Sequence, residues 1–183
     1  SFSGGGASGD WSMVNNNRIE RLWQHWRLPT RRIKQWFPQA TLARLERMIG
    51  ESEAKHMGQI RFVIESNMET MAVLKGVTPR QRARQYFGSL EVWDTAYNTG
   101  VLLYVSCADR AIEIVADRGI SHSVEATVWH DICQSLGKAF AEEMYQQGLE
   151  TALQQMTAVL ISHIPRGEGQ AATDHLSNEI VLR

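Results

Sequence analysis

The sequence has few of the features that mark a specialised class of protein. Its two cysteines, Cys107 and Cys133, show no CxxC or other paired spacing, which favours two buried reduced thiols over a disulfide. No apolar run approaches the roughly 18 residues of a membrane-spanning helix. The N-terminus also lacks the charged-then-apolar pattern of a signal peptide. We therefore expect a cytoplasmic location and no transmembrane segment.

The common catalytic motifs are missing as well. The chain has no GxSxG, no Walker-type GKS/T, no GxGxxG opening a helix and no HExxH, so serine hydrolases, P-loop enzymes, dinucleotide-binding enzymes and zincins have no support. His130 and Cys133 share a helix face but would need two further ligands to hold a transition metal. Catalytic residues stay unknown, and no organic cofactor is expected.

What is present is an ordinary globular composition, with 183 residues, 43% apolar and 21% charged. One domain with short appendages fits this length. We expect that domain over residues 38–165. Residues 1–14 are Gly/Ser-rich and are expected to form a flexible tail, while residues 166–183 are polar and are expected to be a loose C-terminal tail.

Residues 15–37 form a basic segment expected to be helical. Its charged residues are Glu20 and six cations: Arg18, Arg21, Arg27, Arg31, Arg32 and Lys34. Ile19, Trp23 and Trp26 recur at near-helical spacing, so the helix can dock on its own domain through that apolar stripe. The alternative is that the segment contacts a membrane surface or a protein partner. Nucleic acid is not an expected partner.

Two apolar runs, residues 100–106 and 111–116, are joined by a short polar turn and predict a β-hairpin. Antiparallel pairing places the start of the first strand beside the end of the second. Asp94, Asn98, Asp117 and Arg118 flank these ends, so the sequence predicts that they share one end of the sheet.

A third strand is expected over residues 59–65, followed by a helix that begins at Thr78-Pro79 and leads back to residues 100–106. A strand, helix, strand order normally gives two parallel strands. The predicted fold class is therefore α/β, with a small mixed β-sheet, a parallel crossover pair plus the antiparallel hairpin, sandwiched between helices.

The shared sheet end carries the candidate chemistry. Asp94, Asn98 and Asp117 offer the oxygen ligands that hard cations such as calcium or magnesium require. Their spacing matches no standard calcium loop, and Asp and Asn at hairpin ends also serve for turn hydrogen bonds alone. Arg118 can equally neutralise Asp117 as an ion pair.

Several segments together resemble the TPM domain family, in its soluble bacterial branch. They are the run 93–95, Asn98, the strand 100–104 and the run 112–120, and the resemblance spans residues 41–165. It implies an α/β sandwich, a crevice of acidic loop residues that binds a divalent cation, and weak phosphatase activity in which Arg118 would contact an anionic substrate oxygen. Family members usually have two adjacent asparagines where this chain has Asn98-Thr99, which removes one amide ligand.

Overall fold

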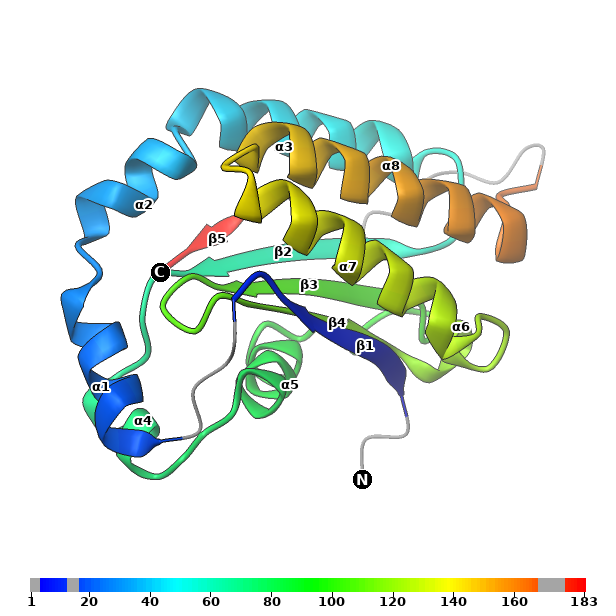
Figure 1. Ribbon diagram of the computed structural model, residues 1–183. Helices are drawn as coiled ribbons and strands as arrows, with labels where there is room; N and C mark the ends of the chain where they lie inside the picture. Colours follow the sequence, from blue (N-terminus) through cyan, green and yellow to red (C-terminus); the bar gives the residue numbers. More distant parts are fainter. Residues whose placement is uncertain (1–3, 13–16, 168–176) are drawn as a thin grey trace.

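The computed structural model describes residues 4–12, 17–167 and 177–183 and contains a mixed sheet covered by helices on both faces (Figure 1). The strand order is β1-β4-β3-β2-β5. Strands β2 and β3 pair in parallel, whereas β3 and β4 form an antiparallel hairpin, so the predicted mixed sheet is confirmed. The strands are β1 (Gly5–Asp10), β2 (Gln59–Glu65), β3 (Gly100–Ser106), β4 (Ala111–Ala116) and β5 (Val181–Leu182).

The helices divide between the two faces of the sheet. Helices α3, α7 and α8 cover one face, α5 covers the other, and α1 and α4 lie together at one end of the molecule (Figure 1). Among the described residues, none of the helices has the length and apolar character that crossing a bilayer demands. The helices are α1 (Arg18–Arg27), α2 (Thr30–Trp36), α3 (Gln39–Glu53), α4 (Thr70–Leu74), α5 (Pro79–Ser89), α6 (Arg118–Ser121), α7 (Ala126–Ala141) and α8 (Tyr145–His163).

Strand β3 is the centre of the sheet and is buried along its whole length. Successive side chains of a strand point to opposite faces. Val101, Leu103 and Val105 accordingly enter the large core under α3, α7 and α8, while Leu102 and Tyr104 enter a smaller cluster against α5. A continuous apolar strand is what coverage on both faces requires.

The predicted flexible tail over residues 1–14 is wrong for residues 5–10, which form β1 and pair with β4. Main-chain pairing supplies hydrogen bonds that a glycine-rich segment can make without side chains. The missing side chains also leave room for α7, because a Cβ on Gly9 would lie 2.9 Å from Cys133 Cβ. Residues 1–3, 13 and 14 lie outside the described residues.

The prediction of a loose tail over residues 166–183 is wrong for its last residues. Val181 and Leu182 form β5 and pair in parallel with β2, and Ile180 is buried. The amide of Arg183 donates to the carbonyl of Ile64 at 3.0 Å, which extends that pairing. Residues 168–176 of the predicted tail lie outside the described part of the chain.

Candidate functional site

The predicted site lies where the hairpin of β3 and β4 has its open end. Val101 pairs with Ala116, and the amide of Asp117 donates to the carbonyl of Gly100 at 2.9 Å. Residues 92–99, which lead into β3, therefore meet residues 117–121, which follow β4. We call these two segments the loop pair, and their meeting is the shared sheet end that the sequence predicts.

Asn98 and Gly119 fix the contact between the two segments. The amide of Gly119 donates to the carbonyl of Asn98 at 2.8 Å. A Cβ at Gly119 would lie 2.2 Å from Tyr97 O and 2.5 Å from Asn98 O, so only glycine allows this approach. Asn98 has a φ of 55°, the left-handed conformation that asparagine tolerates better than most residues.

Asp117 is the buried acid of the site, with 7% of its surface exposed. Its Oδ1 accepts a hydrogen bond from the amide of Arg118 at 2.7 Å and so caps α6. Its Oδ2 is buried and has no hydrogen-bond partner among the described residues. Because buried polar atoms are normally paired, this oxygen can accept a further ligand.

Asp94 and Arg118 are exposed members of the loop pair. The amide of Asp94 donates to the carbonyl of Glu91 at 2.9 Å, and its side chain makes no ion pair within the described segments. The Arg118 guanidinium likewise makes no ion pair with Asp117 within the described residues. The structure thus brings the segments that carry Asn98 and Asp117 together through the contact of Asn98 with Gly119, while Asp94 and Arg118 are exposed.

The donor set of the loop pair suits a hard cation only in part. Within the described residues, no group of three or more His, Cys, Asp and Glu side chains is arranged to hold a metal. The loop pair offers two carboxylates, one side-chain amide and backbone carbonyls. Such a set matches calcium or magnesium with several water ligands, and it excludes a tight, all-protein cage.

His56 lies near the same end of the sheet but is engaged structurally. Its Nδ1 accepts a hydrogen bond from the amide of Gly58 at 3.0 Å, and its Nε2 lies 2.9 Å from Ser52 Oγ. Burial, together with the positive charge of Arg166, lowers the pKa of His56 to about 4. A neutral imidazole with both nitrogens occupied is not free to act as a ligand.

Glu65, at the opposite end of the sheet, is the centre of a buried polar cluster that sequence reasoning missed. Its carboxylate accepts hydrogen bonds from Tyr104 Oη at 2.7 Å, from Arg82 Nη2 at 2.8 Å and from Tyr86 Oη. Both carboxylate oxygens of Glu65 accept hydrogen bonds. Because the donors come from α5 and β3, the cluster connects these elements to β2. The one signal of this cluster in the sequence is a glutamate at the end of a strand whose preceding residues, 62–64, are apolar.

The basic helix α1 docks differently from the prediction. Arg21 and His25 are buried and face Asp109, whereas the expected docking stripe of Ile19, Trp23 and Trp26 is 68%, 59% and 58% exposed. The predicted stripe is therefore wrong. Arg21 and His25 lie one turn apart on the opposite face, and the buried carboxylate of Asp109 selects that face over the apolar one.

Comparison with known proteins agrees with this architecture. Residues 34–159 match the family model described as TPM domain. The NMR structure of the BA42 protein from the psychrophilic bacterium Bizionia argentinensis superposes with a TM-score of 0.69 at 24% identity, covering 79% of this chain and 93% of that chain. At that identity the likeness shows the fold alone. A search of curated proteins finds no match.

Proposed function

The chain belongs to the TPM domain family, and from that premise we propose that its loop pair binds a divalent cation, calcium or magnesium, and supports weak phosphatase activity. The observation that carries the proposal is the unpartnered, buried Oδ2 of Asp117. Asp117, with one carboxylate oxygen unpartnered, and the exposed Asp94 belong to the two segments that meet here, and their negative charges attract a cation.

The expected affinity is low. Calcium sites gain affinity with the number of charged ligands and with the rigidity of the site. Asp117 is held rigidly by its cap on α6, but Asp94 is exposed and Asn98 contributes a neutral amide. We therefore expect a dissociation constant on the order of a millimolar, as in weak calcium modules.

A phosphatase role would place the phosphate beside Arg118. The Arg118 side chain is exposed and unpaired among the described residues, so it can pair with a phosphate oxygen. A bound cation would neutralise further phosphate charge. Asp94 and Asp117 would hold the cation, with the side-chain amide of Asn98 as a further oxygen ligand.

The experiment is an NMR amide titration with calcium and then magnesium on wild type, Asp94→Asn and Asn98→Gly. Asn98→Gly removes the side-chain amide while keeping a residue that adopts the left-handed φ. We expect saturable shifts confined to residues 92–99 and 116–121, lost in Asp94→Asn and weakened in Asn98→Gly. The control Asp131→Asn removes an exposed carboxylate on α7 and should titrate like wild type.

Absence of shifts at millimolar calcium and magnesium would sink the cation site. If the cation binds, hydrolysis of para-nitrophenyl phosphate with and without it tests the phosphatase role. Arg118→Gln should then lower the turnover, and Asp131→Asn should leave it unchanged. Activity that is equal in all variants would assign the hydrolysis to another part of the molecule or to a contaminant.

A second candidate function rests on the exposed faces of α1 and α4. The two helices are in contact, and Trp26 Nε1 donates to Thr70 Oγ1 at 3.1 Å. Exposed aromatic and aliphatic groups next to cations fit the interface of an anionic membrane. The apolar residues of this surface are Ile19, Trp23, Trp26, Met71 and Leu74, and its flanking cations are Arg18, Arg27 and Lys75.

Vesicle binding tests this second candidate. Tryptophan fluorescence should shift to shorter wavelength with vesicles containing phosphatidylserine, and less with neutral vesicles. Trp23→Ser combined with Trp26→Ser should abolish binding. The control Trp93→Ser removes a tryptophan that is 51% exposed on the loop pair and should bind as wild type does. No binding by wild type would leave a protein partner as the remaining use of this surface.

A further inference from the structure

Strand β1 lies at the edge of the sheet between β4 and α7 (Figure 1). Its six residues pair antiparallel with β4, from Gly5 opposite Ala116 to Asp10 opposite Ala111. We call the space that β1 fills the edge groove. The residues that shape it around β1 and the following Trp11 are Arg80, Glu113, Ser121, Cys133, Gly137 and Phe140.

The helical side of the edge groove, made by α6 and α7, requires glycine at two positions of β1, Gly5 and Gly9, and accepts the small side chain of Ala7 between them. A Cβ on Gly9 would lie 2.9 Å from Cys133 Cβ of α7, and one on Gly5 would lie 2.9 Å from Cβ of Ser121, the last residue of α6. The fit is reciprocal, because a Cβ on Gly137 of α7 would lie 2.5 Å from the carbonyl of Asp10. Carbon–carbon or carbon–oxygen contacts under 3 Å would force the backbone to shift. The groove therefore excludes a strand that carries a side chain at the position of Gly5 or Gly9.

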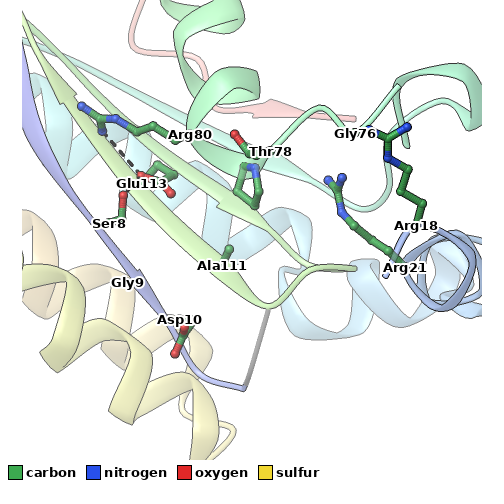
Figure 2. Close-up of a pocket in the computed structure, with 11 residues that line it drawn as sticks. Ser8, Gly9, Asp10, Arg18, Arg21, Gly76, Thr78, Arg80, Ala111 and Glu113 are labelled. Atoms are coloured by element: carbon green, nitrogen blue, oxygen red, sulfur yellow. Dashed lines mark hydrogen bonds and ion pairs between the residues drawn. The ribbon is translucent and has the colours of Figure 1, made fainter. Parts of the chain in front are cut away.

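On the opposite side of the edge groove, Arg80 and Glu113 bind the strand through hydrogen bonds. Arg80 donates to the carbonyls of Ile114 at 2.5 Å and Gly5 at 3.3 Å, bridging β4 and β1. Ser8 Oγ donates to Glu113 Oε2 at 2.5 Å. Figure 2 shows these side chains on a cleft of about 480 Å³ between the sheet and α1, with the Arg80 to Glu113 pair drawn.

Glu113 is suited to a strand that brings a hydroxyl. Burial raises the pKa of its carboxyl, and the hydrogen bonds of Ser8 and Arg80 act against that rise. Removing the strand would strip this buried acid of one of its two partners. The buried carboxylate of Glu113 is therefore stabilised by a strand that has serine or threonine opposite it, at the position of Ser8.

Trp11 ends the segment and anchors it. Its amide donates to the carbonyl of Arg110 at 3.0 Å, which continues the pairing beyond β1. Its ring packs edge-on against Phe140 with centroids 5.0 Å apart. Trp11 is partly buried, and an aromatic side chain that packs beside a strand is a common source of affinity in peptide recognition.

We propose that the edge groove is a sequence-selective acceptor for an extended Gly-Gly-Ala-Ser-Gly-Asp-Trp segment, and that it binds such a segment of another protein chain as well as its own β1. Addition of a strand to a sheet edge draws affinity from main-chain hydrogen bonds and selectivity from the positions of alternate side chains. Both are present here, and none of the contacts described depends on the covalent link between β1 and α1.

The test uses the full chain with a specific protease site inserted between Val14 and Asn15. After cleavage, a fluorescein-labelled peptide of residues 3–12 should exchange with the released strand and bind saturably with one peptide per chain. The uncleaved chain should bind at least about tenfold less, because its own strand competes at high effective concentration. A peptide with Gly9→Val should also bind at least about tenfold more weakly, because its side chain meets Cys133.

A second arm avoids cleavage. The full-length Gly9→Val protein cannot seat its own strand, so it should bind the wild-type peptide. If either form loses structure by circular dichroism, recovery of that structure on adding the peptide supports the proposal. Folded protein that binds no peptide in both arms, unfolded protein that the peptide does not restore, or equal binding of the Gly9→Val peptide would each overturn it.

Discussion

The guanidinium of Arg21 donates two hydrogen bonds to the carboxylate of Asp109, from Nε at 2.7 Å and from Nη2 at 2.9 Å, across 88 positions of the chain. His25 lies one turn along α1, with Nε2 3.1 Å from Asp109 Oδ2. Burial opposes ionisation of Asp109, but the hydrogen bonds of His25 and Arg21 hold its pKa below the ordinary value. This charged cluster docks α1 on the turn between β3 and β4.

We expect Asp109→Asn to destabilise the protein by about 3 kcal/mol or more in the free energy of unfolding, because it leaves the Arg21 guanidinium buried without a counter-charge. Urea denaturation measures the loss. Glu150→Gln is the matched control, since it removes one partner of the exposed pair with Arg44, and it should cost below about 1 kcal/mol. Equal losses in the two variants would contradict the assignment of Asp109 as the anchor of α1.

The docking of α1 also shows what the sequence hides. Ile19, Trp23 and Trp26 have the spacing of a buried stripe, and nothing local distinguishes them from one. Which face of α1 is buried depends on Asp109, which lies in a turn distant in the sequence and is buried there. By contrast, the hairpin and the crossover were predictable, because strand pattern and the Thr78-Pro79 helix start are local signals.

The strand β1 escaped prediction for a related reason. A glycine-rich segment has little apolar surface to bury, so its composition indicates a flexible tail. Its order comes from main-chain pairing with β4 and from the space beneath Cys133, both of which are tertiary properties. For the candidate site, the spacing predicted that Asn98 and Asp117 meet, but the unpartnered Oδ2 of Asp117 is visible only in three dimensions.

Gly119 gives a test of the loop pair as a packed unit. Gly119→Ala should destabilise the protein by about 2 kcal/mol, because the new Cβ would meet Tyr97 O and Asn98 O. It should also shift the amide NMR signals of residues 94–99. Thermal and urea denaturation measure the change in stability.

Gly88→Ala is the control for that substitution. Apart from its chain neighbours and the backbone of its own helix, a Cβ at Gly88, near the end of α5, would have no atom of the described residues within 4 Å. Replacing a helical glycine by alanine then raises helix propensity, so we expect stabilisation of roughly 0.5 to 1 kcal/mol. If Gly119→Ala and Gly88→Ala lowered the free energy of unfolding by similar amounts, the contact of Gly119 with the 92–99 segment would not be the cause of the loss in Gly119→Ala.

The Glu65 cluster predicts a large difference between two tyrosine substitutions. Tyr104 is buried and donates to Glu65 Oε1 at 2.7 Å, and burial together with the charge of Glu65 raises the pKa of its hydroxyl well above the ordinary value. Tyr104→Phe should therefore cost about 1.5 to 3 kcal/mol, the range for a hydrogen bond to a charged group. Tyr97 is 64% exposed, and Tyr97→Phe should leave the urea midpoint unchanged. A small effect of Tyr104→Phe would mean that water replaces the lost donor.

His56 predicts how stability depends on pH. Burial and the charge of Arg166 lower its pKa from 6.5 to about 4, so the unfolded chain binds a proton at His56 before the folded chain does. The contribution to stability is complete above pH 6.5 and is lost as the pH falls toward 4. The loss amounts to roughly 3 kcal/mol.

His56→Asn isolates this contribution, because an asparagine oxygen can take over the hydrogen bond from the amide of Gly58. The variant should be less stable than wild type at pH 7.5, since it loses ring packing and the contact with Ser52. Other groups titrate alike in both proteins, so the gap in the free energy of unfolding should close as the pH is lowered through the window from 6.5 to about 4. His130→Asn removes an exposed histidine and should follow the wild-type curve. A gap that stays constant across this window would show that the folded protein protonates His56 as readily as the unfolded chain does.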